Sequence, residues 1–266
     1  PLTIAGLAGW IMTLSDRYII LSFRGEKEVG IYSACFNVSQ NSMMLIIQLF
    51  TLTTQSLLYN VHEHEGEEAG RKVLTKITQY YLLLALPAAF GLTALATPLS
   101  TILIGKAFRV GRSVIPVIAF TTFLHGLQLR FQGGLNIRKK TLPAMKALLL
   151  SAGLNIVLNL IFVPMYGYQA AAFTSFAAFS VLLALIVIAS RRHYRWPFPW
   201  LSFTRACFSS LLMATTVWFL FGRQRLLPQK ALLLGVPFGI LVYGAALLLS
   251  GEIDLKRLFG HRNQQH

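Results

Sequence analysis

Eight stretches of roughly twenty mainly apolar residues follow one another along the 266-residue chain, separated by short, mostly basic loops. A helix rises about 1.5 Å per residue, so each stretch can cross a hydrocarbon core about 30 Å thick. We expect membrane spans at residues 2–23, 31–58, 80–104, 113–136, 143–163, 169–190, 203–221 and 231–250. These spans leave little of the chain for a soluble domain. The sequence therefore predicts an all-α integral membrane protein, whose function must be read from the polar residues on its helices.

The net charge of +15 does not indicate a nucleic-acid partner, because all but two of the 24 Lys and Arg residues lie in the loops or at the ends of the apolar spans. Lys and Arg in such loops anchor helix ends and contact anionic headgroups, so membrane lipids are the expected partners. Cys35 and Cys207 have no metal-like neighbours in the sequence, and the run His62–Glu65 lacks the spacing of a zinc motif. We expect no metal site and no cofactor.

Two connecting segments have a composition of their own. His62–Gln79 begins acidic and ends basic, which predicts an interfacial helix whose charges complement its dipole. Arg191–Arg205 contains Trp196 and Trp200 beside two prolines, which predicts a linker with an aromatic anchor at the membrane interface. This linker divides the chain into a six-helix unit at residues 1–190 and, at residues 191–266, the linker followed by a terminal two-helix pair.

The loop charges predict the orientation of the chain in the membrane. If Pro1 is cytoplasmic, the cytoplasmic loops and the C-terminal end hold 14 basic residues: Arg71, Lys72, Lys76, Arg138, Lys139, Lys140, Lys146, Arg191, Arg192, Arg195, Arg205, Lys256, Arg257 and Arg262. The opposite loops hold 8: Arg24, Lys27, Lys106, Arg109, Arg112, Arg223, Arg225 and Lys230. The positive-inside rule then places both Pro1 and His266 in the cytoplasm.

The second span carries the clearest polar pattern. One helix face holds, at intervals of three or four, the residues Ser33, Asn37, Asn41, Met44, Gln48, Thr51 and Gln55, and Gln40 widens that face. Amides along the depth of a membrane helix are costly unless they are hydrogen-bonded. One interpretation is the wall of a water-filled cavity that binds a polar, sugar-like solute. The other is hydrogen bonding between packed helices.

Asp16 and Arg17 lie deep in the first span, where a charge costs about 2.5–3.5 kcal/mol on insertion scales. They point about 100° apart on a helix and therefore cannot pair along one face. A functional interpretation makes Arg17 a phosphate contact and Asp16 an ion-coupling site or an orienting partner of Arg17. The alternative is a structural ion pair with another helix.

The fourth and fifth spans carry further polar residues. His125, Gln128, Gln132 and Asn136 share one face of the fourth span, and Arg130 lies on another, within reach of the cytoplasmic headgroups by snorkelling. His125 is expected to be a hydrogen-bonded packing residue rather than a proton relay. A row at intervals of four in the fifth span, interpreted mainly as hydrogen bonding between packed helices, consists of Ser151, Asn155 and Asn159.

Residues 139–141, KKT, and 154–172, LNIVLNLIFVPMYGYQAAA, together with Asp16-Arg17 and the later Val29–Ser33, resemble the polysaccharide flippases of the multidrug/oligosaccharidyl-lipid/polysaccharide exporter superfamily. The resemblance covers about residues 10–190. It implies the C-terminal lobe of a twelve-to-fourteen-helix alternating-access transporter, plus a terminal helix pair. Together with the start at Pro1, inside the first span, this leads us to expect a fragment of a longer protein whose N-terminal lobe is missing.

The resemblance also implies a function, namely flipping of undecaprenyl-pyrophosphate-linked oligosaccharide across the bacterial inner membrane for O-antigen, capsule or exopolysaccharide synthesis. Arginines would attract the pyrophosphate and amides would bind the glycan, which makes the candidate substrate residues Arg17, Arg24, Asn37, Gln40, Asn41, Gln48, Thr51, Gln55 and Arg130. Coupling to Na⁺ or H⁺ would fall on Asp16. Partners would include the missing lobe and, in the pathway, polysaccharide polymerase and chain-length machinery.

Three alternatives remain at this point. A multidrug or cation antiporter of the same superfamily would need a carboxylate-rich cavity, yet Asp16 is the only deeply placed acid in the sequence. A membrane polysaccharide polymerase or ligase would be an enzyme with a sizeable extracytoplasmic loop, whereas the loops on that side are short. A structural partner of glycan machinery is the third. Flipping itself needs no covalent chemistry, so we expect a transporter rather than an enzyme.

Overall fold

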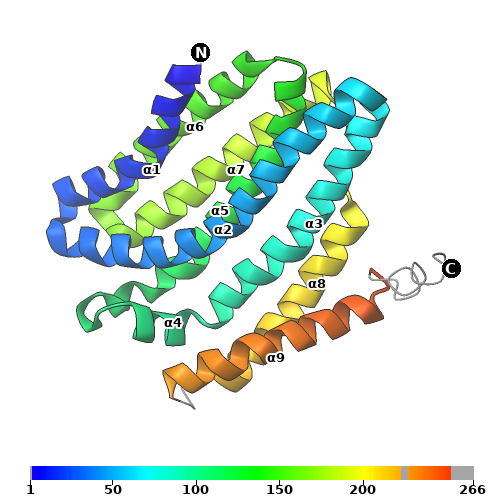
Figure 1. Cartoon of the computed structure of the whole chain (residues 1–266). Helices are drawn as coiled ribbons and strands as arrows, with labels where there is room; N and C mark the ends of the chain where they lie inside the picture. Colours follow the sequence, from blue (N-terminus) through cyan, green and yellow to red (C-terminus); the bar gives the residue numbers. More distant parts are fainter. Residues whose placement is uncertain (1, 223–226, 253–266) are drawn as a thin grey trace.

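The computed structural model describes residues 2–222 and 227–252, and every regular element in that part of the chain is a helix (Figure 1). The helices are, in order, α1 (Leu2–Arg24), α2 (Glu26–Glu65), α3 (Glu67–Ala94), α4 (Ala96–Leu103), the 3₁₀ helix η1 (Lys106–Ser113), α5 (Val114–Ile137), α6 (Thr141–Tyr166), α7 (Tyr168–His193), α8 (Trp200–Val217), the π-helical turn η2 (Trp218–Gly222) and α9 (Pro228–Leu249).

Seven helices within the described residues are long and apolar enough to cross a membrane, so the chain is a multi-pass membrane protein. They are α2, α3, η1 with α5, α6, α7, α8 with η2, and α9. The eighth predicted span is α1, which is helical over 23 residues but is not one of the seven. Part of α1 lies outside the residues whose side chains the structure describes, so the count of seven does not test this eighth span.

The predicted interfacial helix at His62–Gln79 is wrong. α2 continues to Glu65, the chain reverses at Gly66, and α3 begins at Glu67. Gly66 has φ 86°, a left-handed conformation that side chains other than glycine disfavour. The acidic cluster therefore straddles a tight turn instead of starting a separate helix. Glu67 and Glu68 lie in the first turn of α3, where they complement its dipole.

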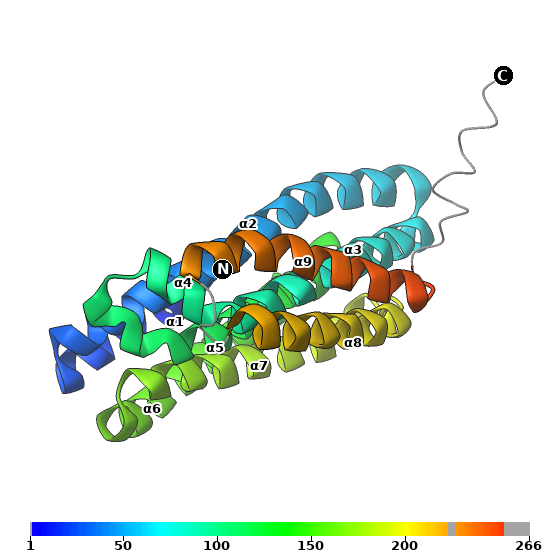
Figure 2. The ribbon, with the colours of Figure 1, turned by 90° about the horizontal axis from the view of Figure 1, so that it is seen from below.

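Helix α5 is central to the bundle and packs against α2, α3 and α7. α7 also packs along α6, and α6 packs against α1, so that α5, α7, α6 and α1 follow one another across this part of the bundle (Figures 1 and 2). Close contact between α3 and α5 needs Gly126, because a Cβ there would collide with the Tyr81 hydroxyl. The terminal pair packs on the same body, α8 along α3 and α9 along α8.

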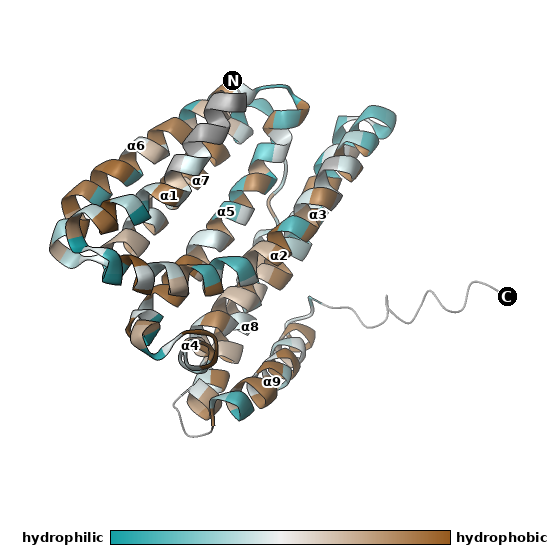
Figure 3. Cartoon of the chain, turned by 60° about the vertical axis from the view of Figure 1, so that its left-hand side comes forward, coloured by the Kyte–Doolittle hydropathy of each residue, from teal (hydrophilic) through white to brown (hydrophobic). Residues whose placement is uncertain are grey.

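Much of the outer surface of the helices is apolar, while polar colour gathers at the connections between them (Figure 3). The most exposed large side chains on α9 include Leu233, Leu241 and Leu249. Exposed leucines at helix surfaces are expected where lipid replaces water as the solvent. The distribution therefore agrees with a bundle whose outer face is in hydrocarbon.

The linker between α7 and α8 is only partly the aromatic anchor that the sequence predicts. Trp200 is 60% exposed, as an interfacial anchor should be, but Trp196 is 8% exposed. The Trp196 ring packs 4.8 Å from the ring centroid of Phe131 on α5. The linker is thus tied to the core of the bundle by one tryptophan and presents the other at the surface.

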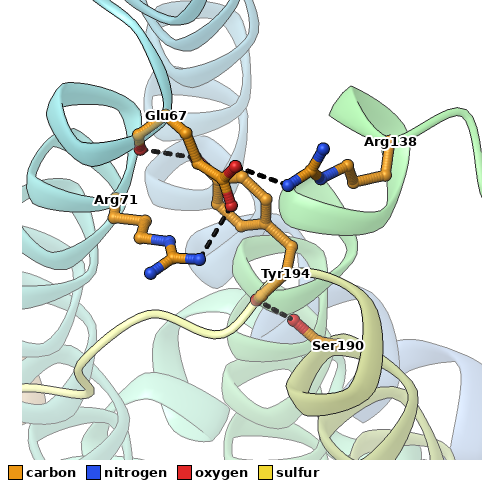
Figure 4. A network of polar contacts seen from close by, with 5 residues as sticks. All are labelled: Glu67, Arg71, Arg138, Ser190 and Tyr194. Carbon is orange, nitrogen blue, oxygen red and sulfur yellow. Dashed lines mark hydrogen bonds and ion pairs between the residues drawn. The ribbon is translucent and has the colours of Figure 1, made fainter.

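Successive helices run in opposite directions, so the connections between them gather at two ends of the bundle. At each end, the carboxylate of a glutamate links neighbouring helices. At one end, Glu67 pairs with Arg71 and with Arg138, and Tyr194 donates to the Glu67 carbonyl oxygen at 3.3 Å (Figure 4). Burial raises the pKa of Tyr194, and the Glu67 carboxylate raises it further, so its hydroxyl stays a donor. At the other end, Glu28 joins α1, α2 and α7 through Arg24 and the Tyr168 backbone N–H.

Candidate functional site

A cavity of about 690 Å³ lies among α1, α2, α5, α6 and α7. Apolar side chains such as Met12, Phe36 and Leu182 form much of its wall. Its polar lining consists of Thr13, Asp16, Gln40, Thr121, Thr122, His125, Gln128, Gln132, Asn136, Lys139, Thr141 and Ser175. The cavity therefore extends from Lys139, in the α5–α6 connection, to Asp16 in the middle of α1.

One side of this cavity is the polar face of α5 that the sequence predicts. His125, Gln128, Gln132 and Asn136 all line it, and the Gln128 amide donates to the Gln132 amide oxygen. The expected hydrogen-bonded packing of His125 is only half right. Its ring meets Phe179 edge-on at 5.5 Å, but its Nδ1 has no hydrogen-bond partner among the described residues. α5 thus presents polar groups to the cavity along its length.

Asp16 lies at the cavity wall with 1% of its surface exposed. Its Oδ2 accepts from the Tyr32 hydroxyl at 2.7 Å and from the Ser175 hydroxyl at 2.6 Å. Its Oδ1 accepts from the Asn159 amide at 2.7 Å. Within the described residues, no basic group forms an ion pair with it. The carboxylate is therefore held by neutral donors from α2, α6 and α7.

The magnitudes explain how the bundle tolerates this acid. A charge at mid-bilayer costs about 2.5–3.5 kcal/mol on insertion scales. A hydrogen bond to a charged group contributes about 1.5–3 kcal/mol. The three bonds to Asp16 together therefore offset the cost even at about 1.5 kcal/mol each, and the carboxylate can remain next to the cavity without a cationic partner.

Further polar groups surround the three donors. Asn155 accepts from Ser15 at 3.1 Å and from Asn159 at 3.2 Å, and Thr174 donates to Asn159 at 2.6 Å. The predicted row of Asn155 and Asn159 therefore does form hydrogen bonds between helices, as expected of packed membrane helices, and it also orients donors toward Asp16. The third member of that row, Ser151, is buried without a described partner.

Sequence analysis did not single out Tyr32, Thr174 or Ser175 as site residues. Tyr32 and Ser175 bond directly to Asp16, although they lie 16 and 159 positions away from it in the chain. A single serine or tyrosine in an apolar span is common and carries no signal by itself. Only the packing of α1 against α6, α7 and α2 makes these side chains partners.

Arg17 points away from the Asp16 network, as their 100° separation on the helix requires. Its guanidinium donates to the Asn37 amide oxygen at 3.1 Å and lies 5.0 Å from the Phe36 ring centroid. Its Nε has no hydrogen-bond partner in the described part of the chain. The Arg17–Asn37 pair lies on the side of α1 and α2 that other described helices leave open, and Asn37 is exposed.

The structure divides the predicted stripe of α2. Gln40 lines the cavity, whereas Asn37, Asn41 and Gln48 are exposed and line neither that cavity nor another described pocket. The Thr51 hydroxyl accepts a hydrogen bond from Arg130 of α5 at 3.0 Å and so points toward the interior of the bundle. Gln55 lies outside the residues whose side chains the structure describes. The stripe is therefore mainly an open polar face of α2.

Two predicted arginine contacts have structural partners. Arg24 pairs with Glu28 at 3.0 Å, at the end of the molecule opposite Lys139. Arg130 does not snorkel to the headgroups: it is 1% exposed, donates to Thr54 at 2.6 Å and to Thr51, and lies 5.7 Å from the Tyr81 ring centroid. The snorkelling interpretation fails because α2 and α3 cover the side chain and α2 supplies two hydroxyl acceptors.

Comparison with known proteins places this geometry in a wider group. The sequence profile described as MatE matches residues 1–161. A probable low-salt glycan biosynthesis flippase, Agl15, of Haloferax volcanii is 24% identical over 254 residues, covering 92% of this chain and 52% of its own. The fold is similar to that of the lipid II flippase MurJ in an inward closed conformation, with a TM-score of 0.76 at 17% identity, over 93% of this chain and 52% of that one. The chain thus spans about half the length of both proteins.

Proposed function

Because the chain belongs to the MatE family, we propose that it forms one lobe of an alternating-access transporter that flips lipid-linked glycans across a membrane. The matching proteins support this proposal, since one is named a glycan biosynthesis flippase and the other a lipid II flippase. A transporter of this kind moves one repeat against another around a midplane site. The proposal therefore includes a second lobe, facing this one, in the working protein.

The observation that carries the proposal is the open polar face of α1 and α2. Arg17, Asn37, Asn41 and Gln48 lie along this face in helices that also expose large apolar side chains, such as Leu45. An arginine and several amides facing hydrocarbon would be costly. Facing a second lobe across a wet cavity, they would bind a diphosphate and sugar hydroxyls, because the guanidinium fork suits phosphate oxygens and amides both donate and accept.

The finer assignment follows the same chemistry. We propose an undecaprenyl-pyrophosphate carrier, a glycan destined for O-antigen, capsule or exopolysaccharide, and a bacterial inner membrane with Pro1 and His266 cytoplasmic. Polymerase and chain-length proteins of that pathway are the proposed partners. The loops that meet around Glu67 carry most of the described basic residues counted on the predicted cytoplasmic side, which supports this orientation.

Asp16 is the proposed coupling site for Na⁺ or H⁺. The support is its position on the cavity wall, its oxygen-rich surroundings and the absence of a cationic partner within the described chain. A cation antiporter would use the same acid, but Asp16 is the one carboxylate among the described residues that line the cavity. A single acid suits coupling to an ion better than recognition of large cationic solutes.

Arg17 provides the test of the binding role. In the complete transporter, Arg17→Ala should reduce glycan flipping in reconstituted vesicles at least tenfold while membrane abundance stays near normal. Arg17→Lys should recover part of the rate, because the charge survives but the bidentate fork does not. Lys106→Ala, an exposed basic residue of η1, is the matched control and should leave the rate unchanged.

A different outcome would contradict the binding role. If Arg17 only stabilises the α1–α2 contact through Asn37, abundance and flipping should fall together and by the same factor. The need for a second lobe is tested separately, by expressing the chain in a flippase deletion strain with and without an N-terminal lobe. Full complementation by the chain alone would contradict the proposal that a second lobe is needed.

A further inference from the structure

A second pocket, of about 680 Å³, lies where the α7–α8 linker meets α3 and α5, away from the cavity beside Asp16. Its walls are contributed by Arg71 of α3, Phe131 of α5, Ser190 and Arg191 at the end of α7, and the linker from Tyr194 to Trp200. It adjoins the Glu67 network, in which Arg71 and Tyr194 lie side by side (Figure 4). The glycan-binding face of α1 and α2 proposed above does not use this region.

The pocket carries an excess of positive charge. Arg191 and Arg195 are exposed and form no ion pair with any described residue. Arg71 does pair with Glu67, but Arg138 shares the same carboxylate. Two arginines therefore share one carboxylate, and only Arg71 of these two lines the pocket. Two more arginines of the lining, Arg191 and Arg195, form no ion pair with a described residue. Guanidinium groups in this arrangement suit a phosphate ligand.

Buried donors without acceptors point to the same ligand. Trp196 lines the pocket and is 8% exposed, yet its Nε1–H has no hydrogen-bond partner among the described residues. The buried Nε–H of Arg71 likewise has no hydrogen-bond partner among the described residues. Buried donors are normally satisfied, so two orphaned N–H groups at one pocket indicate an acceptor-rich occupant. Phosphate oxygens meet that need.

The surroundings suit a ligand with acyl chains. Trp200 and Leu201 are largely exposed where α8 begins, and Phe208 and Leu212 continue the face of Leu201 along the helix. A lipid whose phosphate occupies the pocket could lay its chains along this apolar face. Basic pockets at the cytoplasmic ends of membrane helices are recognised lipid-headgroup sites, and aromatic residues mark the headgroup level.

We propose that this pocket binds the headgroup phosphate of an anionic phospholipid, with Arg191 and Arg195 as charge partners and Trp196 as a hydrogen-bond donor. Because the pocket includes the linker, a bound lipid would join the α8–α9 pair to α3, α5 and α7. This proposal is independent of what the transporter carries.

The test uses the purified chain in a neutral detergent, with phosphatidylglycerol and phosphatidylcholine as probes and native mass spectrometry to count the first bound lipid. Phosphatidylglycerol should bind first and should raise the thermal unfolding midpoint. Arg191→Gln with Arg195→Gln should weaken it about thirtyfold, because each such charge near an anionic headgroup contributes about a fivefold change. Trp196→Phe, which removes the N–H and keeps an aromatic ring, should weaken it several-fold.

The matched control is Arg192→Gln with Lys76→Gln, which removes two exposed charges from the same end without altering the pocket lining. It should leave phosphatidylglycerol binding within twofold. Equal loss in the two double variants would overturn the pocket and leave only diffuse surface charge. Equal binding of phosphatidylcholine would overturn the requirement for an anionic lipid. Stabilisation by free glycerol phosphate that matches the lipid would overturn the role of the acyl chains.

Discussion

The bundle buries two charged side chains to the same degree, Asp16 in α1 and Arg130 in α5, each 1% exposed. Asp16 lies on a cavity wall among donors from three other helices. Arg130 lines no described pocket and is enclosed by two threonines of α2 and the ring of Tyr81. The difference teaches that depth in a membrane helix does not by itself identify a functional charge. Asp16 lines a cavity, whereas Arg130 lines none of the described pockets.

The largest expected effect on stability comes from removing the buried arginine, which tests whether Arg130 is a structural residue. Arg130→Ala should destabilise the protein by about 3 kcal/mol or more, since two hydrogen bonds from a charged donor are lost and a void remains. Arg130→Met should recover most of that loss, because an apolar side chain of similar length fills the space without a charge to bury. Thermal unfolding in detergent measures both. Stable Arg130→Met protein with no flipping activity would show instead that Arg130 serves transport.

A substitution at the contact between α3 and α5, one helical turn from Arg130, should have a smaller effect on stability. Gly126→Ala should cost about 1–3 kcal/mol, because the added methyl would collide with the Tyr81 hydroxyl and approach Ile47. Gly153→Ala is the control, since nothing lies within 4 Å of a Cβ there and alanine favours a helix. The unfolding midpoint should fall for the first variant and stay level or rise for the second. Equal midpoints would mean that α3 and α5 are not in close contact.

The smallest expected effect is in the Asp16 network. Ser175→Ala removes one of three donors to the carboxylate and should cost about 1.5 kcal/mol. Ser180→Ala, in the same helix, breaks only a bond to the backbone of Phe176 and should cost little. We expect Ser175→Ala also to change the concentration of Na⁺ or H⁺ at which flipping is half-maximal. No change in that dependence would weaken the coupling role of Asp16.

The sequence was sufficient to locate seven of the eight predicted apolar spans, because the length of an apolar run shows them. It also predicted the polar face of α5 and the separate directions of Asp16 and Arg17, because these depend on helix periodicity alone. It did not place Ser175 or Tyr32 beside Asp16, since that contact arises from the packing of four helices. It was misleading at His62–Gln79, where acidic and basic residues resemble a dipole-matched helix although Gly66 divides them between two helices. Arg130 was misplaced because its two threonine acceptors on α2 cannot be paired with it from spacing.

Flipping and abundance measured together for Asp16→Asn test the central claim most directly. Asparagine keeps the size of the side chain and an acceptor for part of the network, so we expect at least half of the normal membrane abundance. Flipping per molecule should fall at least a hundredfold and lose its dependence on the coupling ion, because no carboxylate remains among the described residues that line the cavity. Wild-type flipping per molecule with unchanged ion dependence would contradict the proposal that Asp16 couples transport to Na⁺ or H⁺.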